Sequence, residues 1–109
     1  MANPDGQWEW EGQSGKKYVY LVDGIDQQFQ DIPGNYIYAK EASPDGWTPI
    51  YIGETGEGFG KRFAGHEKGP CIEENGATHI HTHYNTSLEV RLAEESDLRD
   101  KWDPVCNKE

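Results

Sequence analysis

The sequence predicts a small α/β (α+β) domain in which helices flank a three-stranded antiparallel sheet. Three short runs rich in aromatic and β-branched residues have the composition of strands, at Asn35–Glu41, Thr48–Glu54 and Thr78–Tyr84. The spacing of apolar residues becomes helical after Thr55 and again after Thr86. A chain of 109 residues has the length of one domain, so we expect a single modest core.

The N-terminal part is less regular. Residues 1–16 are polar, contain glycine and lack a clear period, and we interpret them as a tail or a loosely docked strand. Alternation in Lys17–Asp23 indicates a further strand, which would extend the sheet at its edge. A turn at Pro33-Gly34 then leads into the first strand of the sheet. The domain itself is therefore placed at residues 17–109.

The middle of the chain predicts a hairpin followed by a short helix. Pro44-Asp45-Gly46 separates the first two strands of the sheet and is a turn signal, so these strands should pair antiparallel. Phe59 and Phe63 are four residues apart, which places them on one face of a helix from about Gly58 to Lys68. The glycines in this stretch mark the turn before the helix.

The last helix is the best defined, over about Ser87–Lys101. Thr86 and Glu89 have the spacing of a capping box. At 100° per residue, the apolar stripe of this helix is centred near Leu88, and Glu95 falls in its middle. A carboxylate on the core-facing side requires compensation, because burying an unpaired charge is costly.

Two interpretations of Glu95 follow. It could form an ion pair with Arg91 or Arg99, each four residues away. Alternatively, it could be a metal-binding or catalytic carboxylate at the edge of a cleft. Arg62 and His66 pose the same choice, because they lie beside the phenylalanine stripe and could either pack on aromatic rings or belong to a site.

Composition limits the functions that remain. Twenty acidic against ten basic residues give a net charge of −10, which disfavours nonspecific attraction to nucleic acid or anionic membranes. No apolar stretch reaches the roughly 18 residues of a membrane span, and the N-terminus lacks the pattern of a signal peptide, so we expect a soluble, intracellular (cytoplasmic) protein. Cys71 and Cys106 are accordingly expected to be free thiols.

Three histidines share one face of the third predicted strand. His79, His81 and His83 have a spacing that can chelate Zn²⁺ or Ni²⁺. No cysteine or further histidine stands at a fixed spacing to complete such a site. A solvated strand face is the simpler interpretation.

Together, the site candidates resemble the GIY-YIG nuclease domain. The resemblance rests, in chain order, on Gly34-Asn35-Tyr36, Tyr51-Ile52-Gly53, Arg62, His66, Glu95, Pro104 and Asn107. It covers residues 34–107, about two-thirds of the chain. Asn35 departs from the isoleucine or valine usual in the first triplet, which should affect packing and leave the chemistry intact. The gap between the triplets is slightly long and would be accommodated by a longer hairpin loop.

The resemblance implies a metal-dependent endonuclease that hydrolyses phosphodiester bonds of nucleic acid, in the first place DNA. Glu95 would hold one divalent ion, Mg²⁺ or Mn²⁺, and Arg62 would neutralise charge on the reacting phosphate. Tyr36 would take the proton of the attacking water if nearby cations depress its pKa, and His66 is the competing base. Tyr51 would position the phosphate or the base.

The resemblance also implies supporting residues and partners. The residues with a structural role would be Gly34, Gly53 and Asn107, the last through a hydrogen bond that fixes the helix end. A basic patch of Lys61, Arg62 and Lys68 would contact phosphate on an otherwise acidic surface. The isolated domain should bind nucleic acid weakly, with a protein partner supplying affinity. The alternative is a noncatalytic module of this fold that binds a protein or a nucleic-acid end.

Overall fold

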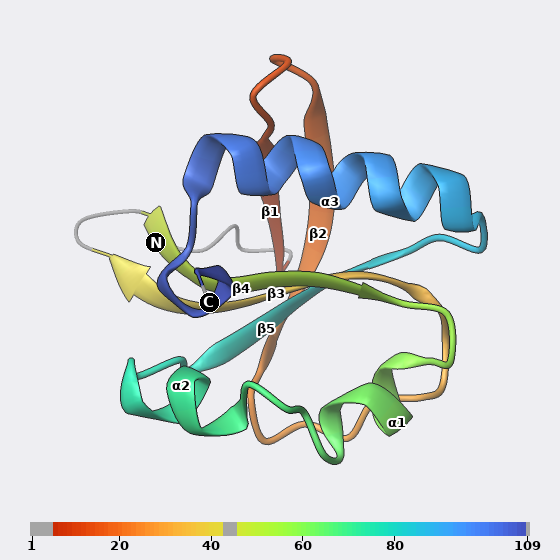
Figure 1. Cartoon of the computed structure of the whole chain (residues 1–109). Coiled ribbons are helices and arrows are strands. Elements are labelled where there is room, and N and C mark those ends of the chain that lie inside the picture. The colour runs from red at the N-terminus through yellow and green to blue at the C-terminus, as the bar shows by residue number, and fades with distance from the viewer. Residues whose placement is uncertain (1–5, 43–45, 109) are drawn as a thin grey trace.

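In the computed structural model, residues 6–42 and 46–108 are described. They form one antiparallel sheet with helices on both of its faces (Figure 1). The strands are β1 (Gln7–Glu11), β2 (Lys17–Gly24), β3 (Gly34–Ala42), β4 (Gly46–Thr55) and β5 (His79–Tyr84). The helices are α1 (Phe59–Phe63), α2 (Gly69–Glu74) and α3 (Leu88–Trp102), followed by a 3-10 turn, η1 (Val105–Asn107).

The predicted fold class, a three-stranded sheet flanked by helices, was wrong. The sheet has five strands in the order β1-β2-β5-β3-β4 and twists into a half-barrel, so that β1 and β2 run across the direction of β3 and β4 (Figure 1). The three predicted strands correspond to β3, β4 and β5. The strand expected at the edge is β2, which lies inside the sheet between β1 and β5. The turn expected at Pro44-Asp45-Gly46 falls mostly outside the described residues.

The N-terminal hairpin joins the sheet because its alternation is aromatic on one side. Trp10 is 1% exposed and Tyr20 is fully buried, and both belong to the core under α3. Glu9 and Val19 are paired neighbours of these residues on the two strands. They point to the opposite side of the hairpin. The hairpin is polar in composition, but on one of its sides every second residue is aromatic and packs its ring into the core.

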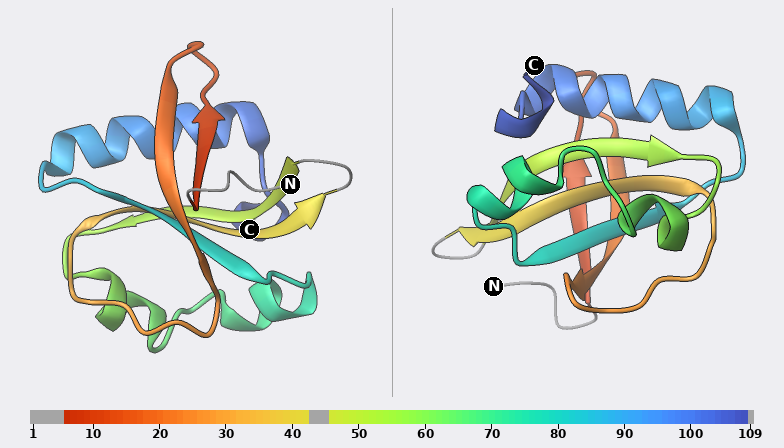
Figure 2. Two further views of the ribbon diagram at one scale, coloured as in Figure 1. Left: turned by 180° about the vertical axis from the view of Figure 1, so that it is seen from behind. Right: turned by 60° about the horizontal axis from the view of Figure 1, so that its bottom comes forward.

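The sheet has two covered faces, and β3 contributes to both. Ile37 and Ala39 point towards α3, whereas Tyr36 and Tyr38 point towards α1 and α2. Figure 2 shows α3 on one side of the sheet and the two short helices on the other. Tyrosines of β3 and β4 therefore meet the first two helices, and α3 lies across the sheet from them.

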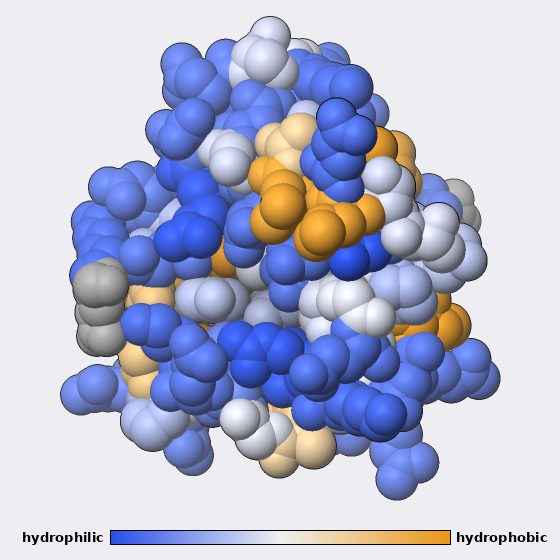
Figure 3. Space-filling view, turned by 45° about the vertical axis from the view of Figure 1, so that its right-hand side comes forward, coloured by the Kyte–Doolittle hydropathy of each residue, from blue (hydrophilic) through white to orange (hydrophobic). Residues whose placement is uncertain are grey.

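The orientation predicted for α3 was wrong. Its buried residues are Arg91, Glu94 and Leu98, whereas Leu88 is 57% and Leu92 44% exposed. Apolar side chains consequently gather on the outer surface over α3 (Figure 3). The longest helix of the described ranges thus buries a mostly polar side, and none of the helices there is both long and apolar enough to cross a membrane.

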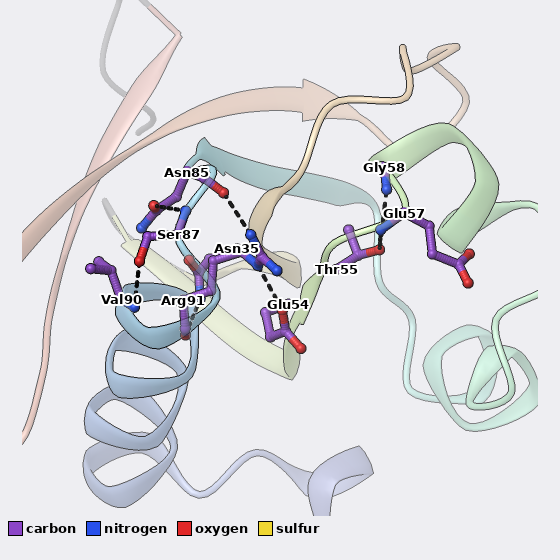
Figure 4. Close-up of polar contacts among 9 residues, drawn as sticks. All are labelled: Asn35, Glu54, Thr55, Glu57, Gly58, Asn85, Ser87, Val90 and Arg91. Carbon is purple, nitrogen blue, oxygen red and sulfur yellow. Dashed lines mark hydrogen bonds and ion pairs between the residues drawn. The ribbon is translucent and has the colours of Figure 1, made fainter.

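Polar groups on the sheet explain this orientation. The Arg91 Nε atom lies 2.8 Å from Glu54 Oε1 of β4, and the Asn35 side chain donates a 2.9 Å hydrogen bond to the carbonyl oxygen of Arg91 (Figure 4). The Tyr20 hydroxyl donates to Glu94 at 2.5 Å. Asn35, unusual in the first triplet, thus anchors α3. The N-cap of the helix is Ser87, whose hydroxyl accepts a hydrogen bond from the Val90 amide; it stands one residue after the predicted cap, Thr86.

The glycine-rich turn before α1 is explained by close packing. Gly58 has φ 120°, and a Cβ atom there would lie 2.5 Å from the Cα of Asp31. A Cβ on Gly60 would lie 2.4 Å from the carbonyl oxygen of Phe29. The β2–β3 connection therefore lies directly against α1, and the Asp31 carboxylate accepts a hydrogen bond from the Lys61 amide.

The single helix predicted over 58–68 was also wrong in extent. Helix α1 ends at Phe63, and a second helix, α2, starts at Gly69 with Pro70 in its first turn. Proline at the first positions of a helix loses no hydrogen bond and favours helix initiation, so Gly69-Pro70 starts a new helix. His66 therefore lies in the connection between α1 and α2.

The expectation of free thiols was wrong as well. Cys71 of α2 and Cys106 of η1 form a disulfide, with their Cα atoms 5.9 Å apart. The two cysteines are 35 positions apart, and the chain between them includes β5 and α3, which return it to α2. Spacing along the sequence could not reveal this proximity.

Replacing Cys71 and Cys106 together with serine is expected to lower the free energy of unfolding by about 3–4 kcal/mol, because the unfolded chain regains the entropy of an open loop of this length. Urea unfolding with and without dithiothreitol measures the effect. The double variant should be insensitive to the reductant, and reduced wild type should approach the variant. Equal stability of all four samples would show that the bond contributes nothing.

Candidate active site

Tyr36, Tyr51 and His66 meet on the face of the sheet that carries α1 and α2. The Tyr36 hydroxyl lies 2.8 Å from His66 Nε2. The rings of Tyr36 and Tyr51 stack with centroids 6.1 Å apart, and the His66 ring stands edge-on to Tyr51 at 4.8 Å. Two strands and the α1–α2 connection thus bring together three residues that the sequence places 30 positions apart at most.

The hydrogen bonds of His66 determine its tautomer. The Lys68 backbone amide donates to Nδ1 at 3.0 Å, so this nitrogen carries no proton. Burial, followed by the charge of Arg62, lowers the pKa of His66 to about 4, and the ring is neutral at pH 7. Its proton is therefore on Nε2, and His66 donates to the Tyr36 oxygen.

The Tyr36 phenol is buried and accepts hydrogen bonds. Burial is the main cause that raises its pKa well above the ordinary value, while the charge of Arg62 and its hydrogen bond to the phenol oppose this. Only 23% of the Arg62 side chain is exposed, and its contact with the exposed Glu67 carboxylate is long, at 3.7 Å. The guanidinium therefore lies beside the phenol without being held in a strong ion pair.

Glu95 is not brought into this cluster by any described contact. It belongs to α3, on the other face of the sheet, and its described ion pair is with Arg99 at 3.6 Å. Burial raises its pKa, Arg99 opposes this, and Glu54 nearby adds to it. Its side chain is 17% exposed. The ion-pair interpretation of Glu95 thus has a direct counterpart in the structure, with Arg99 as the partner.

As a metal site, Glu95 offers one carboxylate. No group of three or more histidine, cysteine, aspartate or glutamate side chains that could hold an ion occurs within residues 6–42 and 46–108. Glu54 is engaged by Arg91. The partly exposed Glu95 oxygens are hard ligands, so they fit Mg²⁺ or Mn²⁺ in a site where water supplies the other ligands.

Two glycines and Asn107 shape the surroundings of the tyrosines. A Cβ on Gly53 would lie 2.7 Å from the Tyr36 hydroxyl, and one on Gly34 would lie 2.3 Å from the His83 carbonyl oxygen. The Asn107 side chain pairs with the backbone of Ile52, accepting at 2.8 Å and donating at 2.9 Å. Asn107 thereby fixes η1 to the outer edge of β4, next to Tyr51.

The predicted basic patch is partly assembled around His66. Lys61 is exposed on α1, and Lys68 is half-buried close to the ring. Tyr38 and Phe63 also belong to this surface, although sequence reasoning missed them. The Tyr38 ring lies 5.5 Å from His66 and 5.6 Å from Phe63. Alternation along β3 could have found Tyr38, because it places this residue on the same face as Tyr36.

The histidines of β5 have separate partners. His81 is fully buried and accepts a hydrogen bond from Trp10 Nε1 at 2.9 Å. His83 pairs with Glu94 at 2.8 Å, and His79 contacts the Thr78 hydroxyl. The interpretation as a solvated strand face was wrong, because this face lies against the core under α3.

Acid is expected to destabilise the fold through His81. Burial lowers the pKa of His81 to about 3, so the unfolded chain takes up a proton at higher pH than the folded one. The contribution of neutral His81 to the free energy of unfolding is therefore complete above pH 6.5 and is lost as the pH falls towards 3. From pH 7 to 5, the free energy of unfolding should fall by about 2 kcal/mol through His81, with a smaller contribution from the half-buried His66, which solvent screens. Urea titrations measure this slope.

Two variants separate the histidines in that experiment. His81→Phe should reduce the slope below pH 6.5 strongly, whereas His66→Phe should reduce it by less. His83 does not interfere, because its hydrogen bond to Glu94 raises its pKa, and its contribution is already complete below 6.5. An unchanged slope in His81→Phe would contradict the assignment.

Comparison with known proteins adds no relative. No family model, curated protein or solved structure matches the chain.

Proposed function

We propose that this protein is a metal-dependent endonuclease that hydrolyses phosphodiester bonds of nucleic acid, in the first place DNA. The observation that carries the proposal is the hydrogen bond from the neutral His66 to Tyr36, with Arg62 beside the same hydroxyl. One surface thus holds Tyr36 as a candidate base, His66 as the group that orients it, and Arg62 as a cation that can bind phosphate. This combination is what hydrolysis of a phosphodiester requires.

Each residue has a role in this proposal. Arg62 binds a nonbridging oxygen of the phosphate and neutralises the charge that develops there. Tyr36 takes the proton of the attacking water, and Tyr51 stacks on the Tyr36 ring and positions the phosphate. Tyr36 can take that proton only as its phenolate, after its own proton has passed to solvent; the hydrogen bond from His66 and the charge of Arg62 favour this form, whereas burial opposes it. Glu95 would hold the Mg²⁺ or Mn²⁺ ion, which would supply positive charge, but from the face of the sheet opposite to Tyr36.

The charge of the chain implies weak binding by this protein alone. With a net charge of −10, long duplex contacts are repelled, and attraction is confined to the patch of Lys61, Arg62 and Lys68. A protein partner would then supply most of the affinity. In living cells this corresponds to a cutting module delivered to its target.

A noncatalytic binding module is the alternative function. It is favoured by one observation: Glu95 pairs with Arg99, on the face of the sheet opposite to Tyr36. In that case the acidic surface would be the face that meets a protein or a nucleic-acid end, and no metal would be needed.

Arg62→Ala decides between the two functions in a cleavage assay. With plasmid or single-stranded DNA and Mg²⁺ or Mn²⁺, the variant should cut roughly 30- to 1,000-fold more slowly, because one charge-stabilising contact is lost. Lys40→Ala removes a positive charge from an exposed site on β3 and is the control. Absence of EDTA-sensitive cutting by the wild type would favour the binding module.

A further inference from the structure

A cavity of about 480 Å³ lies beside His66, on the face of the sheet that carries α1 and α2. In Figure 2, right, these helices and the β2–β3 connection frame this face. Its walls include Phe29 of the connection, Tyr38 of β3, Phe63 of α1 and Ile72 of α2. The lining is thus largely apolar and aromatic, as in sites for small planar ligands.

His66 separates this cavity from the proposed phosphate site. Its ring lies 5.5 Å from Tyr38, which lines the cavity, and 4.8 Å from Tyr51, which belongs to the phosphate site. Tyr36 and Tyr38 alternate along β3, with ring centroids 5.9 Å apart. A ligand that reaches from one site to the other is therefore short, of the order of one nucleotide.

The polar groups of the cavity indicate what it binds. No hydrogen-bond partner of the Tyr38 hydroxyl occurs among the described residues, and burial raises the pKa of Tyr38 to about 12, so the group is a neutral donor or acceptor. Asp26 and Glu73 also line the cavity. Carboxylates accept hydrogen bonds from amino groups, as they do from cytosine. The described lining residues include neither lysine nor arginine, which does not suit an anion.

We propose that this cavity binds one unpaired, amino-bearing nucleobase, from the nucleotide whose phosphate lies at Arg62. The inference rests on the proposed function for the position of the phosphate. The aromatic walls stack on the base, and Asp26 or Glu73 accepts from its amino group, so adenine, cytosine and guanine are preferred over thymine. A base enters such a cavity only when it is single-stranded or turned out of the duplex. The substrate is therefore nucleic acid with unpaired nucleotides.

The acidic surface is consistent with this contact. Recognition through one base and one phosphate needs far fewer favourable charges than a duplex footprint. The net charge of −10 then discourages binding along paired DNA.

Binding is tested without metal, so that it does not depend on cleavage. The 109-residue chain, labelled with ¹⁵N, is titrated in EDTA with dCMP, dAMP and TMP. The purine and cytosine nucleotides should shift the amide signals of Gly69, Ala77 and Phe63, and TMP should bind roughly fivefold more weakly, because one hydrogen bond is lost.

A pair of glycine variants locates the site. Gly69 lines the cavity, and a Cβ atom there meets nothing within 4 Å, so Gly69→Phe fills the cavity without a backbone clash. Gly46→Phe is the matched control, since that position is equally open and lies outside the cavity. Nucleotide-induced shifts should disappear in Gly69→Phe and persist in Gly46→Phe.

The remaining outcomes are distinct. Nucleotides that shift the cavity signals in a protein without cleavage activity would support the base site and refute the endonuclease. A wild type that cuts, together with Gly69→Phe cutting single strands equally fast, would overturn the base site alone. If N-acetyl-tryptophanamide shifts the cavity signals and the nucleotides do not, the cavity takes a side chain of a protein partner, and the proposal is wrong.

Discussion

Replacing Glu95 with alanine is expected to abolish metal-dependent cleavage while the fold stays intact. Glu95 is the single protein ligand proposed for the ion, so no other side chain is available to hold it. The stability of the variant should change little, because the ion pair with Arg99 is long, at 3.6 Å, and partly exposed. Cleavage at several Mn²⁺ concentrations and thermal unfolding measure the two effects.

Glu89→Ala is the matched control for Glu95→Ala. It removes an exposed carboxylate from the first turn of the same helix and should cut like the wild type. If Glu95→Ala cuts as fast as Glu89→Ala, the role of Glu95 is limited to its ion pair with Arg99. The metal ion is then bound elsewhere or is not required.

Tyr36→Phe is expected to slow cleavage by roughly 10²- to 10⁴-fold, the range in which removal of a general base falls. The phenyl ring retains the stacking on Tyr51, so the fold should be preserved. Rates measured from pH 6 to 10 distinguish the two base candidates. Loss of Tyr36 should flatten the pH–rate profile, whereas His66→Ala should lower the rate and keep the shape of the profile.

Tyr84→Phe is the control for this series, since Tyr84 is 62% exposed and has no described ring contact with the cluster. A flattened profile in His66→Ala instead would make His66 the base. In that case the Nδ1 hydrogen bond from Lys68 would have to break during the reaction.

Local patterns were sufficient for the part of the fold that carries the tyrosines. Alternation in β3, β4 and β5 depends on neighbours along the chain and was readable from the sequence. The same alternation explains why Tyr36 and Tyr51 meet: both lie on one face of a hairpin. The proximity of His66 was predicted from helical spacing, although it lies in a connection after α1.

Features that depend on distant partners could not be predicted. The orientation of α3 is determined by Tyr20, Asn35 and Glu54, which attract the polar side of the helix that a hydrophobicity pattern would turn outwards. Glu95 was therefore assigned to the centre of the buried side, whereas that centre is occupied by Arg91, Glu94 and Leu98. Pairing of β2 with β5 and of Cys71 with Cys106 joins segments that no local signal connects.

The N-terminal hairpin also has a consequence for synthesis of the protein on the ribosome. Strand β2 emerges early, but its neighbour β5 begins at His79, and Trp102 of α3 donates a hydrogen bond to the carbonyl oxygen of Glu11. Trp10 and Tyr20 therefore stay uncovered until α3 has left the exit tunnel. This domain should fold only after α3 has been synthesised, and truncated chains that lack α3 should be targets for chaperones and aggregation.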